Sequence, residues 1–259
     1  MIRQYERVLD DERVQEFRDS GFCVLRHAFD PEALSHEIDR CLQDGLFVPE
    51  TAISFEHVET RYLPMMCERT PVSRSLLYAF ADPATQLLGR PVLPMRAKGS
   101  RYFGDTTWHS DSTRGVSSIG FLAYLEPLAA SSGALRVRPG SHVRKDVARV
   151  SERVVSTTPG DVIVFDEHLE HRSVGGGVRR QWRVDYVADP ITEDEASEVK
   201  SYFAGIYEVG WDGGYDVDRY PNYDAHWHQN SPYRARLKDL GALHRAHAHE
   251  DFVRRRRLP

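Results

Sequence analysis

The stretch PGDVIVFDEHLEH, residues 159–171, decides the fold. Pro159, Gly160 and Asp161 form a turn signal, and residues 162–165 are a short apolar run of the kind that forms a buried strand. Two histidines, His168 and His171, follow just past the expected end of this strand. The pattern predicts a β-rich core in which a strand delivers polar side chains to one place.

Similar β-prone runs lie on both sides of this strand, from about residue 92 to residue 188. They read PVLPMR, SSIGFLAYLEP, ALRVRP, RVVSTTP and QWRVDYV, and Gly, Pro and Ser residues separate them. Many short strands in one continuous stretch are typical of a sandwich or a jelly roll. We therefore expect a mainly β fold with flanking helices.

Helix signals lie before and after this region. Expected helices run from Asp10 or Asp11 to Gly21, from Asp30 to Gly45, over 71–89 with a break near Asp82-Pro83, and over 193–207. The first two have an aspartate at the start and a glycine at the end, the residues that cap helices. We expect one domain made of a helical cap and first strand (1–91), a jelly-roll core (92–188) and a C-terminal extension (189–259).

Charge and composition exclude several classes of partner. Thirty-four basic against 39 acidic residues give a net charge of -5, which does not favour nucleic acid, and the RRRR at 254–257 is typical of a solvated tail. No run approaches the ~20 apolar residues of a membrane helix, and the charged N-terminus lacks a signal-peptide pattern. Cys23, Cys41 and Cys67 form no CxxC pair, which suits a reducing compartment. The expectation is a cytoplasmic protein with a small-molecule partner.

A candidate metal site begins with WHSDS, where His109 and Asp111 are two residues apart. Alternate side chains of an extended segment share a face, so an imidazole and a carboxylate can converge on one ion. A mononuclear iron(II) oxygenase needs two histidines and one carboxylate, with the remaining positions open. A jelly roll can bring the histidine that follows the strand at 162–165 to this pair.

Four motifs together resemble the phytanoyl-CoA dioxygenase family of iron(II)- and 2-oxoglutarate-dependent oxygenases. They are VQEFRDSGFCVLRHAFDPEAL near the N-terminus, WHSDS, SGALRVRPGSH, and GDVIVF followed by His171, and they cover most of residues 10–188. The resemblance implies a double-stranded β-helix core and the metal ligands His109, Asp111 and His171. It implies that His168 is a bystander and that His142 has a structural role.

Besides the metal, 2-oxoglutarate needs a partner for its distal carboxylate. The planar fork of an arginine matches a carboxylate in shape and charge. Arg179, Arg180 and Arg183 are candidates, because they follow a GGG that is expected to form a hairpin turn. In the family the arginine lies seven residues before an aromatic, and Tyr186 then selects Arg179. A register shift by one residue would select Arg180. Ser173 resembles the hydroxyl that supports the same carboxylate.

The resemblance implies that iron(II), 2-oxoglutarate and dioxygen oxidise an unactivated C–H bond, releasing succinate and carbon dioxide. Halogenases of this superfamily replace the carboxylate ligand by a small residue, so Asp111 argues against halogenation. Hydroxylation, epimerisation, desaturation and oxidative cyclisation stay open. We expect a natural-product intermediate, for example in antibiotic biosynthesis, as substrate, and the sequence does not predict the oligomeric state.

Candidate substrate contacts lie in 51–80, in the segment before the metal motif and in the C-terminal extension. They are Lys98, Arg101, Asp105, Trp108, Trp211 and Tyr215. His226, His228, His244, His247 and His249 could bind a metal but are better explained as exposed residues. Two other functions fit the same triad: a metalloenzyme, such as a hydrolase or isomerase, that needs no 2-oxoglutarate, and an inactive binding module.

Overall fold

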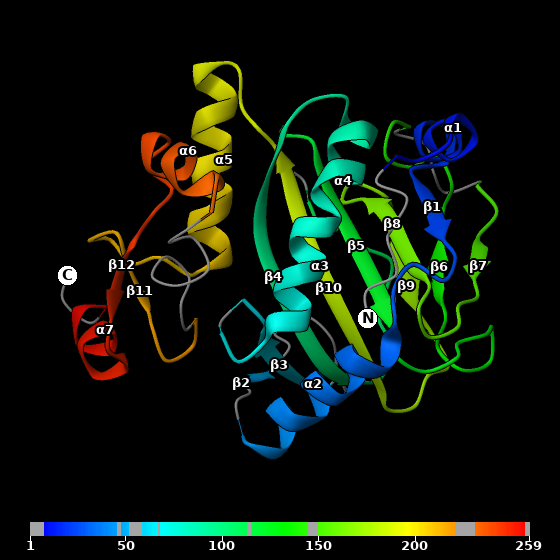
Figure 1. The fold of residues 1–259 in the computed structure, drawn as a ribbon, viewed down its shortest axis with the longest axis horizontal. Helices are drawn as coiled ribbons and strands as arrows, with labels where there is room; N and C mark the ends of the chain where they lie inside the picture. Colours follow the sequence, from blue (N-terminus) through cyan, green and yellow to red (C-terminus); the bar gives the residue numbers. More distant parts are fainter. Residues whose placement is uncertain are drawn as a thin grey trace.

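The main element of the computed structural model is a seven-stranded antiparallel sheet (Figure 1). The structure describes residues 8–45, 48–51, 59–66, 68–112, 115–144, 150–220 and 231–256. In spatial order the sheet contains β1 (Phe22–Leu25), β8 (Val162–Asp166), β5 (Ser118–Tyr124), β10 (Arg179–Ala188), β4 (Val92–Phe103), β3 (Glu59–Pro64) and β2 (Val48–Thr51). Strands far apart in the sequence are neighbours, as a jelly roll requires.

Helices cover one face of this sheet. They are α1 (Asp11–Ser20), α2 (Pro31–Gln43), α3 (Pro71–Ala79) and α4 (Ala81–Leu88), and Figure 1 shows α3 and α4 lying across the central strands. Asp10 and Asp30 cap the first two helices, as predicted, because their carboxylates accept backbone N–H groups of the first turn. The break between α3 and α4 lies at Phe80, slightly before the predicted position, and Pro83 is tolerated in the first turn of α4.

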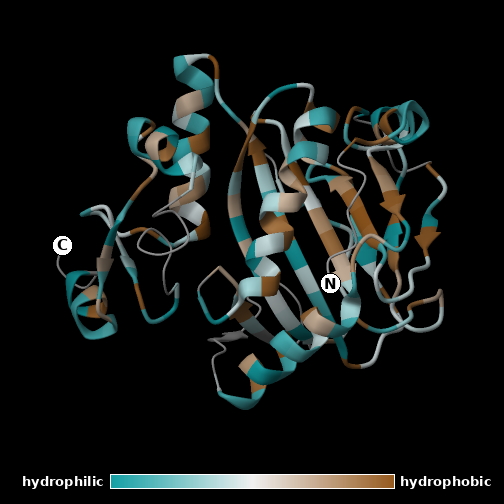
Figure 2. Ribbon diagram, viewed as in Figure 1, coloured by the Kyte–Doolittle hydropathy of each residue, from teal (hydrophilic) through white to brown (hydrophobic). Residues whose placement is uncertain are grey.

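A three-stranded sheet packs on the other face and completes the jelly roll. Its order is β7 (Arg153–Val155), β6 (Leu135–Val137) and β9 (His171–Ser173). The apolar cluster between the two sheets comprises Phe22, Leu122, Tyr124, Leu128, Ala134, Leu135, Val137, Val155, Ile163, Phe165 and Leu169. Figure 2 shows that hydrophobic residues dominate the central strands β5 and β8. The mainly β jelly-roll expectation is confirmed.

The C-terminal extension forms a third part, next to β4 of the main sheet (Figure 1). It contains α5 (Glu193–Ile206), β11 (Gly214–Asp216), α6 (Tyr233–Asp239), β12 (Arg245–His247) and α7 (His249–Arg256). The predicted helix at 193–207 is confirmed as α5, which begins with a capping box at Thr192 and Glu195. None of the described helices is both long and apolar enough to cross a membrane.

Three features of the strands differ from the sequence expectations. Strands β2 and β3 lie within 1–91 and extend the sheet, and β4 runs on to Phe103 rather than ending near Arg96. The GGG at 175–177 is not a hairpin turn, because β9 pairs with β6 whereas β10 pairs with β4 and β5. The chain instead crosses from one sheet to the other at this point. Cys67, His226 and His228 lie outside the described residues.

Candidate active site

Strand β8 and the loop after it bring His171 between the two sheets. The turn before β8 is held by Asp161, whose carboxylate accepts the backbone N–H groups of His27 and Thr158 at 3.0 Å each. These bonds, with an ion pair to Arg26 at 2.7 Å, lower the pKa of Asp161 although burial opposes them. After β8 the chain turns, and His171 begins β9 with its side chain only 6% exposed.

The WHSDS segment lies beside β9 like an additional short strand. The backbones of His109 and His171 exchange two hydrogen bonds, of 3.1 and 2.9 Å. Asp111 donates its backbone N–H to the carbonyl of Glu167 at 2.9 Å. This pairing sets the relative positions of residues that are far apart in the sequence.

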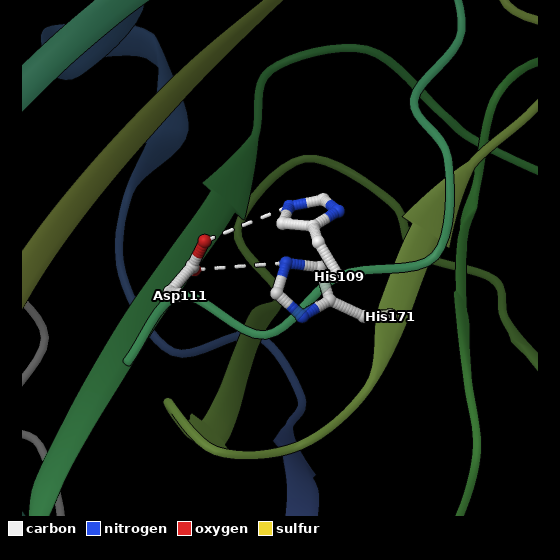
Figure 3. A group of neighbouring side chains, drawn as sticks. All are labelled: His109, Asp111 and His171. Carbon is white, nitrogen blue, oxygen red and sulfur yellow. Dashed lines mark ion pairs between the residues drawn. The ribbon is translucent and has the colours of Figure 1, made fainter. Parts of the chain in front are cut away.

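His109, Asp111 and His171 come together at this place (Figure 3). The Nε2 atom of His109 is 3.6 Å from Oδ1 of Asp111, and Nε2 of His171 is 3.6 Å from Oδ2 of the same carboxylate. One ligand atom from each residue lies within 4.8 Å of the others. Among the described residues this is the one group of three or more such side chains that could hold a metal ion.

Both imidazoles present the correct nitrogen for a metal. His109 Nδ1 lies 2.8 Å from the carbonyl oxygen of Thr107, and His171 Nδ1 lies 2.9 Å from that of Leu169. A carbonyl oxygen only accepts, so each Nδ1 carries the proton and each Nε2 is the unprotonated nitrogen of a neutral imidazole. Burial lowers the pKa of His171, although Asp111 opposes this effect. The neutral form that a metal requires is therefore favoured.

Arg183 of β10 donates a hydrogen bond to the carboxylate of Asp111. Its Nη1 donates to Asp111 Oδ2 at 2.5 Å, and its Nη2 donates to Glu167 at 2.5 Å. Burial would raise the pKa of Asp111, but Arg183 and the two histidines hold it well below its usual range. The carboxylate is therefore ionised, as a metal ligand must be. The sequence indicated Arg183 as a candidate arginine but did not indicate this contact.

Arg179 and Arg180 lie on opposite faces of β10. Arg179 points between the sheets, is 2% exposed, and donates from Nη2 to the hydroxyl of Ser173 at 2.7 Å. Arg180 points to the helical face and forms ion pairs of 2.7 Å with Asp39 and Glu126. Arg179 and Ser173 could thus act together on a carboxylate inside the jelly roll, whereas Arg180 faces away from Ser173.

Two glycines make space for the Arg179 guanidinium. A Cβ atom at Gly176 would lie 2.3 Å from its Nη1, and one at Gly133 would lie 3.2 Å from the same atom. Gly176 belongs to the GGG, so a glycine of this motif allows the backbone to pack closely against the guanidinium of Arg179. The guanidinium also lies 4.4 Å above the ring of Tyr102. Its buried Nε has no hydrogen-bond partner among the described residues.

The remaining histidines have other contacts. His168 Nδ1 pairs with Asp166 at 2.8 Å, and the ring of His142 packs against Gly21, in agreement with the roles predicted for them. In the extension, His247 pairs with Asp212 at 3.1 Å and His249 with Asp216 at 2.7 Å. His244 is buried.

The candidate substrate residues are dispersed. Trp108 lies between the guanidinium groups of Arg138 and Arg172, at 4.2 and 4.7 Å. The carboxylate of Asp105 accepts the N–H of Gly175 at 2.9 Å. Both contacts brace the loops around the site.

Four other candidate substrate residues occupy different parts of the molecule. Tyr215 is fully buried in the extension, and Trp211 is 72% exposed. Arg101 lines an open pocket of about 410 Å³ on the helical face, with Asp39 and Arg180. Lys98 pairs with Arg183 in the register of β4 and β10 and shares its inner face.

Comparison with known proteins identifies the family. The model of the phytanoyl-CoA dioxygenase family matches residues 17–180 of the 259 in the chain. The chain belongs to this family. It is accordingly an iron(II)- and 2-oxoglutarate-dependent oxygenase, and the resemblance seen in the sequence is confirmed. No curated protein matches the chain in a sequence search.

Solved structures of low sequence identity share the fold. The epimerase SnoN from nogalamycin biosynthesis is 15% identical, with a TM-score of 0.61 over 69% of this chain and 80% of its own. HygX from Streptomyces hygroscopicus, solved with nickel and 2-oxoglutarate, is 18% identical, with a TM-score of 0.57 over 72% and 90%. EctD from S. alaskensis, solved with 2-oxoglutarate and 5-hydroxyectoine, is 22% identical, with a TM-score of 0.58 over 70% and 77%. These likenesses place the family's jelly roll in this chain.

Proposed function

We propose that this oxygenase oxidises an unactivated C–H bond of a small natural-product intermediate, with iron(II) held by His109, Asp111 and His171. The convergence of the Nε2 atoms of two histidines on one ionised carboxylate supports this assignment best. Two histidines and a carboxylate on one face are the donor set of non-haem iron(II) oxygenases, which leaves positions for co-substrate and dioxygen. The residues present therefore fit the metal.

Arg179 and Ser173 are proposed to bind the distal carboxylate of 2-oxoglutarate. The guanidinium is buried, braced by Ser173 and Tyr102, and directed between the sheets, where a charge-assisted hydrogen bond is strong. A metalloenzyme without 2-oxoglutarate would give this buried cation no ligand to bind. The arrangement thus favours the oxygenase over the hydrolase or isomerase alternative.

The chain's own residues contribute binding, orientation and exclusion of water. When bound, iron(II) with 2-oxoglutarate and dioxygen supplies the oxidising chemistry, in which one oxygen atom enters succinate and a hydroxylation would place the other in the product. The protein orients the C–H bond and the co-substrate. Asp111 occupies the ligand position that halogenases leave open, so we propose hydroxylation, epimerisation, desaturation or oxidative cyclisation and not halogenation.

The substrate class is the least constrained part of the proposal. SnoN was solved with nogalamycin RO and HygX with hygromycin B, and EctD with 5-hydroxyectoine. All of these are small molecules, which supports a small-molecule substrate here. No helix among the described residues is suited to cross a membrane, and the net charge of the chain is negative. A cytoplasmic location stays a prediction.

The test is anaerobic titration of the protein with iron(II) and then 2-oxoglutarate, with detection of the visible charge-transfer band of the chelate. We expect the band in the wild type and its loss in His171→Ala. His168→Ala, three residues earlier and outside the triad, should keep it. Absence of the band from folded wild-type protein, or an equal loss in both variants, would contradict the proposed site.

A further inference from the structure

Arg183 is the centre of a network of acidic side chains behind the proposed metal ligands. Its three nitrogens donate to three different carboxylates: Nη1 to Asp111 and Nη2 to Glu167, each at 2.5 Å, and Nε to Asp185. Glu167 and Asp185 have side chains that are only 1% exposed, whereas that of Asp111 is 23% exposed. The guanidinium thus reaches outward from the core to the one carboxylate of the three that is open to a ligand.

The surroundings fix the guanidinium in this position. Gly120 lies under it, and a Cβ atom there would be 3.2 Å from Nη2 of Arg183. The ring of Phe165 lies 5.0 Å from its central carbon and also contacts His171. The guanidinium of Arg183 has little freedom to move, because carboxylates, a glycine and an aromatic ring surround its planar fork.

Two further residues anchor the carboxylates. Arg96 of β4 donates to Asp185 at 2.8 Å, and the hydroxyl of Tyr202 in α5 donates to Glu167. Burial, together with Asp185, raises the pKa of Glu167 to about 7, although Arg183 opposes this shift. The network therefore connects Asp111 to β10, to β4 and to the C-terminal extension.

The contact with Asp111 is made to one specific oxygen. Each oxygen of Asp111 lies 3.6 Å from one imidazole, Oδ1 from Nε2 of His109 and Oδ2 from Nε2 of His171, but Arg183 donates to Oδ2. A carboxylate can bind a cation through one oxygen or through both. An oxygen that already accepts a charge-assisted hydrogen bond at 2.5 Å is a poorer second ligand.

We propose that Arg183 is a positioning residue that keeps Asp111 bound to the metal through Oδ1 alone, so that the co-substrate can chelate with two oxygens. The inference rests on the proposed function. In an octahedral site, three protein ligands, a chelating 2-oxoglutarate and dioxygen use all positions, so a second oxygen from Asp111 would compete with one of them. Partners that hold a ligand in this way strongly affect metal sites.

The experiment compares two dicarboxylates on the nickel(II)-loaded protein. 2-Oxoglutarate can chelate through its keto acid, whereas glutarate has the same distal carboxylate but lacks the keto group. The ratio of their dissociation constants therefore measures chelation separately from binding at Arg179. The variant Arg183→Lys keeps the positive charge but cannot hold three carboxylates. The matched control is Arg180→Lys, which alters an arginine on the same strand whose carboxylate partners lie on the other face.

In Arg183→Lys we expect the preference for 2-oxoglutarate over glutarate to shrink about tenfold or more. The chelate band with iron(II) should shift or weaken, while glutarate affinity and the control variant stay at wild-type values. A purely structural ion pair predicts a lower melting temperature with an unchanged ratio, and that result would overturn the inference. Should Arg183→Lys fail to fold, Gly120→Ala, whose Cβ would press on Nη2 of Arg183 and on the ring of Phe165 without removing either residue, is measured against the same criterion.

The proposed function and this inference fail in different ways. If wild-type protein shows no chelate band, the proposed function fails. If the wild type shows the band and both Arg183→Lys and Gly120→Ala keep the full preference for 2-oxoglutarate, only the role of Arg183 is refuted.

Discussion

Arg179 and Arg180 are neighbours on β10, yet their guanidinium groups lie on opposite faces of the sheet. We expect Arg179→Lys to weaken 2-oxoglutarate binding about 10- to 100-fold, because a hydrogen bond to a charged group contributes roughly 1.5–3 kcal/mol. Lysine keeps the charge but loses the fork and the stacking on Tyr102. Calorimetric titration of the nickel(II)-loaded protein measures the change. Equal losses in Arg179→Lys and Arg180→Lys would show that the inner face of β10 is not the binding face.

At the same scale, the sequence predicted the triad better than its surroundings. The HxD spacing and the histidine after β8 carry enough local information, because strand alternation and the family motif both fix them. Strand alternation predicts that Arg179 and Arg180 lie on opposite faces of β10, but it does not predict which of the two faces points between the sheets. The contact of Arg183 with Asp111 depends on how deep each side chain lies between the sheets. Its only signal was a row of alternate polar residues, Arg179, Gln181, Arg183 and Asp185, on a strand whose other residues are apolar except for Arg180.

Among the elements, β8 depends on the turn that starts it, and Asp161 holds that turn. Its carboxylate accepts from two backbone N–H groups, the hydroxyl of Thr158 and Arg26. An asparagine cannot accept all of these bonds and brings donors of its own, so we expect Asp161→Asn to lower the free energy of unfolding by about 2 kcal/mol at pH 7. Urea denaturation of both proteins measures this difference.

The effect of Asp161 should also depend on pH in one direction. Its pKa is lowered in the folded state, so the wild-type advantage is complete above the ordinary carboxyl pKa of about 4 and is lost as pH falls through the folded value. The stability gap between wild type and Asp161→Asn should therefore narrow as the pH falls below about 4. A gap that stays constant or widens on acidification would show that Asp161 does not act as an ionised cap.

Elements with strong local signals were predictable, and elements made by tertiary contacts were not. The caps at Asp10 and Asp30 and the apolar run of β8 are local, and all three expectations are confirmed. Strand β9 has only three residues, His171–Ser173, and is a strand because it pairs with β6. The GGG was not recognised as a crossing between the sheets, because the strands that β9 and β10 pair with are set by tertiary contacts; Gly176 makes room there for the guanidinium of Arg179.

Across the whole molecule, the family model ends at residue 180, but the network behind the site continues beyond it. Arg183 and Asp185 follow on β10, and Tyr202 reaches Glu167 from α5. The hydroxyl of Tyr207 also donates to the backbone carbonyl of Met95 in β4. The extension therefore shares its core with the jelly roll, which supports the prediction that residues 1–259 are one domain.

A single domain should unfold in a single transition, and a mutation in the extension should shift all of it. Phe203 is fully buried on the side of α5 that carries Val199 and Tyr202, so Phe203→Ala should lower the free energy of unfolding by about 3–5 kcal/mol. Ile191→Ala, at a residue that is 79% exposed, is the control and should change it by less than about 0.5 kcal/mol. Scanning calorimetry of the three proteins tests this, because a shared core makes the extension and the jelly roll melt together. If Phe203→Ala split the transition in two and left the upper one at the wild-type temperature, the extension would be a separate unit, and Tyr202 could not couple it to the metal site through Glu167.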